Sequence, residues 1–266
     1  MRLTLIITTY ERVDALSAVL STLAQQVQSP DELVVADDGS DQATRRVVEQ
    51  FGERAGFPVH HVWQEHQGFR AARVRNLAIA RASGDYSVFV DGDMLLHPWF
   101  IADHRRHARR GTFTQGTRIQ LDAGSTRRAL QSPGAHLGVT SSGLGGLRRL
   151  CALHAPRLSS LARRLANGFV AVKSCNLGVW REHLLAVNGF NEDFVGWGPE
   201  DKELVARLEH NHVRRQTLLF GGIAYHLQHA PAARDHLSAN AAILAATRAR
   251  RLTRCEHGLD SYLPTR

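Results

Sequence analysis

The chain has 266 residues, 43% of them hydrophobic, which is enough to bury a substantial core as one large or two small domains. Its formal net charge of +8 comes almost entirely from arginine, since Lys173 and Lys202 are the only lysines, and this charge favours anionic partners: nucleotide diphosphates, nucleic acid or an anionic membrane face. No run of about 18 apolar residues occurs, which argues against a membrane-spanning helix.

The first half of the chain alternates strand and helix patterns. Apolar runs predict strands at 3–8, 32–36, 59–63 and 86–90, and amphipathic segments predict helices at 13–26, 42–51 and 71–82. This alternation indicates a parallel sheet with helices on its faces. The segment lacks GxGxxG after a strand and lacks GxxxxGK[ST]. The main sequence signatures of dinucleotide-binding and P-loop proteins are therefore missing from it.

The pattern weakens from about 111 to 168, where Gly, Ser and Arg surround a basic amphipathic stretch at 147–165. Two interpretations of this stretch stay open: a solvated helix that covers a sheet edge, or a helix that binds a membrane surface or an acceptor. Order returns at 170–180. A helix is then predicted at 201–211, a strand at 217–221 and a helix at 238–251.

The cellular compartment follows from the N-terminus and the cysteines. Residues 1–7 run directly into polar residues without a cleavable apolar segment, which predicts a first strand and not a signal peptide. Cys151, Cys175 and Cys255 form an odd, scattered set without CxxC spacing. They argue against a disulfide framework or a zinc site, so we expect a reducing, cytoplasmic location.

A pair of carboxylates follows the strand predicted at 86–90. Asp91 and Asp93 flank Gly92, and a turn loosened by this glycine lets both face one ligand at the carboxyl end of the strand, where α/β proteins bind ligands. One could hold a divalent cation while the other takes a ribose hydroxyl or a metal-bound water. Hard oxygen donors suit Mg²⁺ or Mn²⁺ bridging a diphosphate. A lone DxD is weak evidence by itself, but this position strengthens it.

Two histidines near the C-terminal end are candidate nitrogen ligands. His226 and His229 are three residues apart, a spacing that brings both imidazoles together on a helical turn. Nitrogen donors shift the preference toward Mn²⁺ over Ca²⁺. Because the chain has 15 histidines, a coincidental pair is a real alternative.

A second acidic motif, Gly196-Trp197-Gly198-Pro199-Glu200-Asp201, lies about a hundred residues after the first. Acids in the first turn of the following helix would stabilise it, and this is the simplest interpretation. However, the Gly-Trp-Gly-Pro turn also forms an aromatic shelf suited to a sugar ring. A carboxylate beside it could act as general base for an acceptor hydroxyl.

Two further groups could contact a nucleotide. Asp37 and Asp38 follow the second strand and could accept from a nucleobase N–H and a ribose hydroxyl. A basic run at the start of the helix before the DxD strand suits phosphate or base contact: Arg70, Arg73, Arg75 and Asn76. Either group alone more often marks a helix start or a solvated face.

Together these motifs resemble the family 2 glycosyltransferases with the GT-A fold. The resemblance covers about residues 3–100 and 170–230. Its motifs are Ile6-Ile7-Thr8-Thr9-Tyr10-Glu11-Arg12, Asp37-Asp38-Gly39-Ser40, Ala72-Arg73-Val74-Arg75-Asn76 and the DxD. Asn188-Gly189-Phe190-Asn191-Glu192 and the tryptophan-acid motif are similar to the C-terminal region of β-1,4-galactosyltransferases and bacterial chondroitin-type polymerases.

The resemblance implies an α/β fold of the GT-A class: a Rossmann-like, mostly parallel sheet flanked by helices, with a C-terminal acceptor-binding part. One continuous domain would comprise a nucleotide-sugar-binding half at 1–110, a variable basic insertion at 111–169 and an acceptor-binding, catalytic half at 170–266.

The resemblance also implies a role for each matching residue. Thr8, Thr9, Tyr10, Arg12 and Asp38 would line the nucleoside pocket, with Arg75 near the donor. Asp91 and Gly92 would contact the ribose side of the donor, and Asp93 the metal, Mn²⁺ or Mg²⁺. His229 matches the metal-binding histidine of the family, whereas His226 falls where galactosyltransferases have methionine. Asp201 falls at the catalytic-base position, with Trp197, Gly198 and Glu200 on the acceptor.

We therefore expect an inverting, metal-dependent glycosyltransferase that moves a hexose or N-acetylhexosamine from a UDP-sugar in a single displacement. The expected acceptor is an oligosaccharide or lipid-linked glycan of a bacterial surface, such as a lipopolysaccharide core or capsule precursor. Charge and the 147–165 stretch suggest peripheral contact with an anionic membrane at the inner face of the cell membrane. Pro199, Lys202 and Glu203 depart from the galactosyltransferase pattern and leave the donor and acceptor open.

Two alternatives belong to other classes. A basic, non-catalytic nucleic-acid-binding protein would account for the charge, but its basic residues are not interleaved with aromatics, and both acidic motifs stay unexplained. We therefore expect no nucleic-acid partner. A sugar nucleotidyltransferase shares the α/β layer and the metal-binding acids but needs a Gly-rich, Lys- or Arg-bearing signature after the first strand, which Thr8 to Arg12 does not provide.

Overall fold

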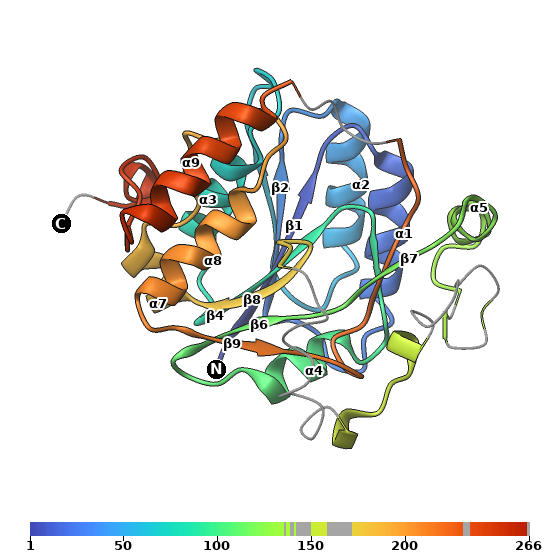
Figure 1. Ribbon diagram of the computed structural model, residues 1–266. Coiled ribbons are helices and arrows are strands. Elements are labelled where there is room, and N and C mark those ends of the chain that lie inside the picture. The colour runs from blue at the N-terminus through green and yellow to red at the C-terminus, as the bar shows by residue number, and fades with distance from the viewer. Residues whose placement is uncertain (136, 139–140, 142–149, 159–171, 231–234, 265–266) are drawn as a thin grey trace.

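A seven-stranded sheet forms the centre of the computed structural model, which describes residues 1–135, 137–138, 141, 150–158, 172–230 and 235–264 (Figure 1). Within this sheet only β8 runs antiparallel to its neighbours, so the prediction of a mostly parallel α/β sheet is confirmed. The strand order is β3 (Val59–Trp63), β2 (Glu32–Asp37), β1 (Leu3–Thr9), β4 (Tyr86–Asp91), β8 (Asn176–Trp180), β6 (Thr112–Gln115) and β9 (Arg214–Thr217).

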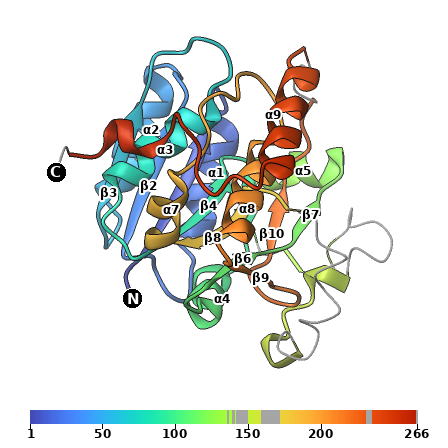
Figure 2. The same cartoon turned by 60° about the vertical axis from the view of Figure 1, so that its left-hand side comes forward.

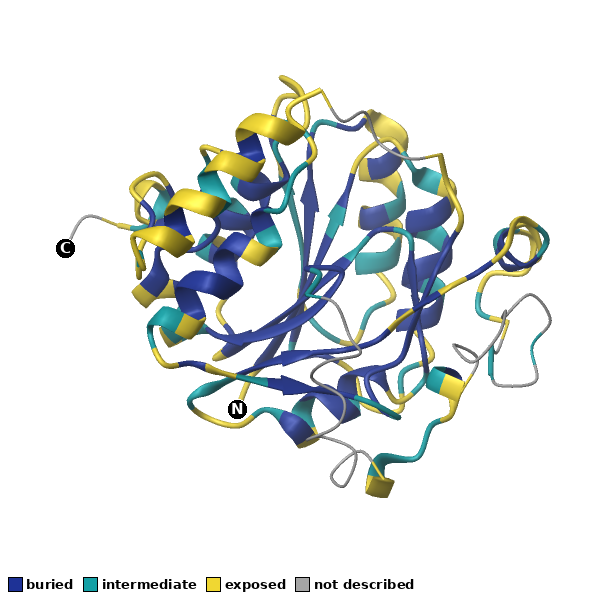
Figure 3. Ribbon diagram, viewed as in Figure 1, coloured by how far each residue is buried: buried dark blue, intermediate teal, exposed yellow. Residues whose placement is uncertain are grey.

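Helices cover both faces of the sheet because side chains alternate along each strand. Leu5 and Ile7 of β1 lie in a core shared with α1 (Val13–Leu23) and α2 (Gln42–Gly52). Ile6 lies in the opposite core, which includes α3 (Ala71–Arg81), α7 (Arg181–Val187) and α8 (Glu200–His210). The central strands β1, β2, β4 and β8 are correspondingly buried between the two helical layers (Figure 3).

A second, three-stranded sheet brings the DxD turn beside the C-terminal histidines. It consists of β5 (Met94–Leu96), β10 (Ala224–His226) and β7 (Arg118–Gln120), with β10 between the other two. Met94 is directly opposite His226, and the backbone N–H of Leu227 donates to the carbonyl of Asp93 at 3.0 Å. Helices α4 (Phe100–His107) and α5 (Ala123–Gln131) flank this part of the chain.

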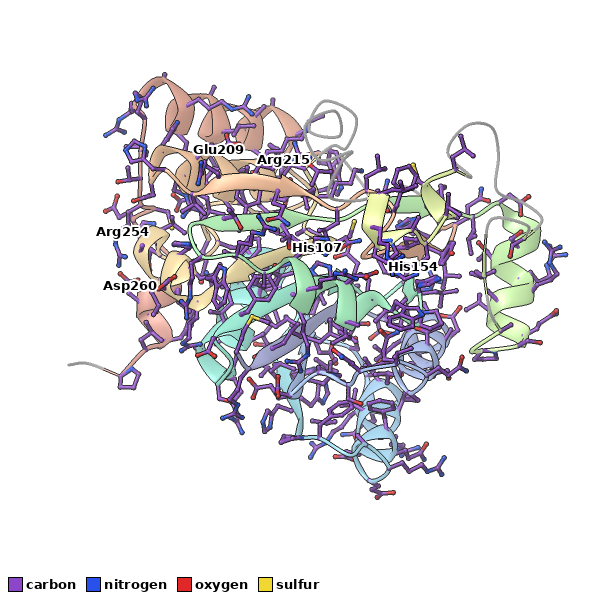
Figure 4. All side chains as sticks on the ribbon, turned by 90° about the horizontal axis from the view of Figure 1, so that it is seen from below. His107, His154, Glu209, Arg215, Arg254 and Asp260 are labelled. Atoms are coloured by element: carbon purple, nitrogen blue, oxygen red, sulfur yellow. The ribbon has the colours of Figure 1, made fainter. Side chains whose placement is uncertain are left out.

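The C-terminal segment folds back over the helical layer that contains α7 and α8 (Figure 2). Helix α9 (Leu237–Ala249) packs against α8, and the short helix η2 (Leu259–Tyr262) packs against α3. Asn188 ends α7 in the left-handed conformation, and its Nδ2 donates to Cys255 O and to Asp260 Oδ1, both at 3.1 Å. Arg254 Nη2 pairs with Asp260 Oδ2 at 2.8 Å (Figure 4).

The strand predicted at 217–221 is wrong. Strand β9 ends at Thr217, and Phe220 and Gly222 have positive φ values of 62° and 55°, which an extended strand cannot accommodate. The chain turns there and enters β10. Helix α1 also ends at Leu23, three residues before the predicted end.

Residues 111–169, predicted as an insertion, begin inside the sheets. β6 lies between β8 and β9, and β7 pairs with β10. Most of the basic stretch at 147–165 is outside the described residues, including Arg148, Arg149, Arg163 and Arg164. Among the helices that the structure describes, none has the length and apolar character needed to cross a membrane.

Candidate active site

The site forms where the strand order reverses, between β1 and β4. Thr8 is paired with Asp91, and the N–H of Gly92 donates to Thr8 O at 2.7 Å, so the DxD turn lies against the end of the first strand. A Cβ on Gly92 would lie 3.0 Å from Thr9 Oγ1, so a larger residue would crowd this turn. Ligands of open α/β sheets bind at such carboxyl-terminal switch points.

Asp93, His226 and His229 converge into one cluster whose ligand atoms all lie within 4.8 Å of one another. Asp93 Oδ2 lies 3.3 Å from His226 Nε2 and 3.2 Å from His229 Nε2. The two histidines meet because His226 ends β10 and His229 lies in the following loop, and not on a helical turn. One carboxylate and two imidazoles form a donor set that could hold a divalent metal ion.

Polar atoms around the cluster support a metal-binding role. Asp93 Oδ1 and His226 Nδ1 are buried and have no hydrogen-bond partner among the described residues. His229 Nδ1 lies 2.6 Å from the carbonyl of Ala230, an arrangement that leaves Nε2 facing Asp93, as metal-ligating histidines commonly do. Burial lowers the pKa of His226 to about 4, so its imidazole is neutral at neutral pH.

Arg75 connects the DxD strand to the second acidic motif. It lies on α3, is 4% exposed, and its guanidinium reaches three partners: Thr8 Oγ1 at 3.2 Å, Asp91 Oδ1 at 3.3 Å and Glu200 Oε1 at 2.9 Å. Burial alone would lower the pKa of Arg75, but Glu200 and Asp91 outweigh it and raise the pKa. The buried guanidinium of Arg75 therefore forms a network that joins the half-exposed Asp91 to the buried Glu200, which lies 125 positions from Arg75.

Asp201 lies in the first turn of α8, next to this network. Its Oδ2 accepts from the backbone N–H of Ser174 at 3.2 Å and its Oδ1 from the N–H of Lys202 at 2.7 Å. Burial raises the pKa of Asp201 above 3.8, although Arg75 and the two backbone amides act in the opposite direction. A carboxylate with a raised pKa is a stronger base than an ordinary aspartate.

Burial also raises the pKa of the neighbouring carboxylates. For Asp91, the positive charge of Arg75 lowers the pKa, and the negative charges of Asp93 and Asp201 add to the effect of burial and raise it. For Glu200, Arg75 again lowers the pKa, while burial and the negative charge of Asp201 raise it. The carboxylates of Asp91, Glu200 and Asp201, all with raised pKa values, thus lie around the buried guanidinium of Arg75, and such clusters of perturbed carboxylates are typical of functional sites.

The residues assigned to the nucleoside pocket lie at the ends of β1 and β2. Asp38 is buried, with Gln64 Nε2 donating to Oδ1 and the N–H of Arg70 donating to Oδ2 at 2.9 Å. Tyr10 is partly exposed and its ring stacks on His66, with centroids 4.2 Å apart and planes 10° apart. Thr9 Oγ1 is buried and has no partner among the described residues.

Of the residues that the sequence resemblance assigns to the acceptor, one is exposed and one is buried. Trp197 is 40% exposed, whereas Glu200 is buried and paired with Arg75. Arg75 therefore holds Glu200 below the surface. Asp201, the other acid of the tryptophan-acid motif, instead binds the backbone of Ser174. The positive charge of Arg12 acts on His229 of the Asp93–His226–His229 cluster, and the Arg12 side chain pairs with Asp14 at 3.0 Å.

Sequence reasoning missed three residues that the fold brings to this site. Ser174 supplies the amide that binds Asp201, His66 stacks on Tyr10, and Arg118 of β7 acts electrostatically on Asp91 and His226. Arg118 belongs to the segment where the sequence pattern weakens, so only the pairing of β7 with β10 places it here. The sequence does contain a signal for His66, namely the glycine at position 39. Gly39 has a φ of +97° and lies so close to His66 that a side chain would not fit.

Two family models match the chain. The glycosyl transferase family 2 model matches residues 4–152, and the model described as the N-terminal domain of galactosyltransferase matches residues 164–230. The two matches meet the two halves of the site: the first contains the DxD turn and Arg75, and the second contains Asp201 and both histidines.

The chain is also similar to known transferases and to a solved structure. It is 30% identical over 217 residues to validoxylamine A glucosyltransferase of Streptomyces hygroscopicus subsp. limoneus, covering 77% of this chain and 47% of that protein. It is 28% identical over 242 residues to chondroitin synthase of Pasteurella multocida (strain Pm70), covering 84% and 24%. The chain thus spans about half or less of the length of these relatives.

Among solved structures, S. aureus TarS in complex with UDP-GlcNAc superposes with a TM-score of 0.64 at 18% identity, covering 98% of this chain and 69% of that one. At this identity the likeness shows the fold. It is the GT-A fold, in agreement with the prediction from the sequence motifs.

Proposed function

Because the chain belongs to glycosyl transferase family 2, we propose that it moves a hexose or N-acetylhexosamine from a UDP-sugar to an acceptor hydroxyl in one inverting displacement. The observation that carries this proposal is the Arg75 network. Arg75 joins Asp91, in the DxD turn, to Glu200, next to Asp201, so the proposed donor-binding and base-bearing segments meet at one guanidinium.

The donor would bind along the ends of β1, β2 and β4. Asp38 and the exposed ring of Tyr10 would enclose the nucleobase, while Thr8, Thr9 and Arg12 line the nucleoside pocket. Asp91 and Gly92 would contact the ribose, and Arg75 would hold Asp91 in place. TarS was solved with UDP-GlcNAc, a donor of the proposed class, in the same fold.

Asp93, His229 and His226 fit a divalent cation, Mn²⁺ or Mg²⁺, and the two imidazoles favour Mn²⁺. A cation there would neutralise the charge that grows on the leaving diphosphate. The protein itself orients the ligand atoms: Ala230 fixes the His229 ring through Nδ1, and the β5–β10 pairing holds His226 next to Asp93.

Asp201 would act as the general base. Its carboxylate would accept the proton of the acceptor hydroxyl as that oxygen attacks the anomeric carbon from the face opposite the leaving diphosphate. The amides of Ser174 and Lys202 hold the carboxylate in position. Trp197 would carry a sugar ring of the acceptor, and Gly198 would keep the loop close to the protein beneath it.

The proposed acceptor is an oligosaccharide or lipid-linked glycan of a bacterial surface, reached from the inner face of the cell membrane. Validoxylamine A glucosyltransferase and chondroitin synthase are transferases with unlike acceptors, so the family alone leaves the acceptor open. Membrane contact rests on the +8 charge and on the basic stretch at 147–165. Co-sedimentation with anionic vesicles that is unchanged after substituting Arg148, Arg149, Arg163 and Arg164 would remove this support.

A thermal-shift screen of UDP-, GDP- and dTDP-sugars, with and without Mn²⁺, tests the donor assignment. We expect a UDP-sugar to raise Tm only when Mn²⁺ is present, because binding to the folded state stabilises it. The same screen with Asp93→Ala should lose the metal-dependent part of the shift. Stabilisation by GDP- or dTDP-sugars alone would contradict the proposed donor.

A further inference from the structure

The loop that carries Trp197 is held by a buried asparagine on α9. Asn240 is 2% exposed, and its Nδ2 donates to Val195 O at 2.9 Å and to Trp197 O at 3.1 Å. A carboxamide nitrogen has two hydrogens, and here each has an acceptor. The two carbonyls that flank Gly196 are therefore tied to one side chain.

The close approach of His236 and Asn240 explains both glycines of Gly196-Trp197-Gly198. Gly196 has a φ of +74°, and a Cβ on it would lie 2.5 Å from His236 Cδ2. A Cβ on Gly198 would lie 2.5 Å from Asn240 Nδ2 and 2.9 Å from its Cγ. His236 and Asn240 are four residues apart, so they lie on one face of the helix start. The helix can approach the loop only because these two positions lack side chains.

The loop is also fixed from its other side. The N–H of Gly196 donates to Phe69 O at 2.9 Å, and the next residue, Arg70, donates its N–H to Asp38 in the nucleoside pocket. Phe69 and Trp197 remain 39% and 40% exposed along this backbone connection. Two exposed aromatic residues therefore lie on adjacent segments that are joined by a backbone hydrogen bond.

We propose that Asn240 is a positioning residue for the acceptor. By fixing the carbonyls of Val195 and Trp197, it holds the indole of Trp197 ready to receive a pyranose ring of the acceptor glycan. A loop that is ordered before binding spares the acceptor the entropy of ordering it, which raises transfer efficiency without affecting the donor. This inference rests on the proposed glycosyl transfer at the same site.

Asn240→Leu tests the proposal because leucine preserves the branched shape but removes both N–H donors. Thr247→Val is the matched control on the same helix. Thr247 is also buried, and its Oγ1 donates to Glu203 at 3.0 Å, away from the Trp197 loop. Both variants remove a buried donor from α9, so a general loss of stability would affect them alike.

Fluorine NMR of protein labelled with 5-fluorotryptophan reads the loop directly and needs no substrate. The chain has four tryptophans, and Trp197→Phe assigns the resonance of Trp197. We expect this resonance to shift or broaden in Asn240→Leu and to stay unchanged in Thr247→Val. An unchanged Trp197 resonance in Asn240→Leu overturns the positioning role, whatever the protein catalyses.

Kinetics then separate the acceptor from the donor, with UDP-glucose and Mn²⁺ as donor probe and p-nitrophenyl β-glucoside as acceptor probe. In Asn240→Leu, we expect kcat/KM for the glucoside to fall at least about tenfold, while hydrolysis of UDP-glucose without acceptor changes less than about twofold. Equal losses in both reactions, or the same loss in Thr247→Val, contradict the proposal. If the wild type neither hydrolyses nor transfers any UDP-sugar, the proposed function fails, and the NMR result alone decides the role of Asn240.

Discussion

Arg75 Nη1 donates to Glu200 Oε1 at 2.9 Å, joining residues that lie 125 positions apart. The pair is buried, with side-chain exposures of 5% for Arg75 and 11% for Glu200, and the same guanidinium reaches Asp91. Because Asp201 follows Glu200 directly, this contact helps to fix the position of the proposed base relative to the DxD turn. In the proposed function, Glu200 would hold the two segments together and Asp201 would accept the proton.

The first prediction concerns the stability of this pair. Arg75→Met should lower the free energy of unfolding by about 3–5 kcal/mol, because it leaves the Glu200 carboxylate buried without its partner. Urea denaturation measures the loss. The double variant Arg75→Met/Glu200→Leu should recover part of it, since both charges are then removed; a double variant less stable than the single one would contradict the pairing.

The second prediction separates Asp201 from Glu200 in catalysis. Asp201→Asn should reduce kcat by about 10²–10⁴-fold, the usual contribution of a general base, while the Kd for UDP in the presence of Mn²⁺ stays unchanged. Transfer assays and calorimetric titration with UDP measure the two quantities. Retained turnover in Asp201→Asn would overturn the assignment.

The third prediction concerns the acid limb of the pH–rate profile. Burial raises the pKa of Asp201, and the base must be deprotonated to accept a proton. Activity should therefore be lost, as pH falls, at a higher pH than the ordinary aspartate value of 3.8 would give. The pH dependence of kcat measures this limb, and a limb centred at or below that value would show that Asp201 is not the group that titrates.

The fourth prediction concerns metal binding. Asp93→Ala and His229→Ala should each weaken Mn²⁺ binding, measured by calorimetry with UDP present, by at least about tenfold. His226→Ala should have a smaller effect. The carbonyl of Ala230 orients the His229 ring through Nδ1, whereas Nδ1 of His226 has no hydrogen-bond partner among the described residues. His257→Ala is the control, since this exposed histidine pairs with Asp193 and not with Asp93. Equal affinity in all four variants would exclude the site.

The fifth prediction concerns acid stability. Burial would raise the pKa of Glu32, but hydrogen bonds from Thr4, Ser83 and Gly84 outweigh it and lower the pKa below 4.5. A lowered pKa in the folded state adds stability that is present above the unfolded value and is lost as pH falls through the folded value.

Glu32→Gln should therefore be less stable than wild type in urea at neutral pH, and the difference should shrink as the pH is lowered below 4.5. Glu49→Gln is the matched control, because Glu49 is exposed and pairs with the exposed Arg45, so its effect should stay within about 0.5 kcal/mol. A difference for Glu32→Gln that grows with acid would reverse the assigned sign.

The first half of the fold could be predicted from the sequence because its signals are local. Strands β1, β2, β3 and β4 and the helices between them follow apolar runs and amphipathic periods. The predicted strand at 217–221 failed for an equally local reason. Its apolar residues are typical of a strand, but Phe220 and Gly222 adopt positive φ values. The strand forms earlier in the chain, where Arg214–Thr217 pairs with β6.

The sequence by itself determined the residue types of the site: two acidic motifs, a histidine pair and a tryptophan between glycines. Tertiary structure alone decided which of these residues meet. The β5–β10 pairing brings His226 and His229 to Asp93, and Arg75 buries Glu200 while Asp201 is held by Ser174. Asn240 binds Trp197 from a helix that no local signal connects to it. The physical reason is that side-chain chemistry and local periodicity are properties of neighbouring residues, whereas burial, pairing and the resulting pKa shifts depend on contacts between segments far apart in the chain.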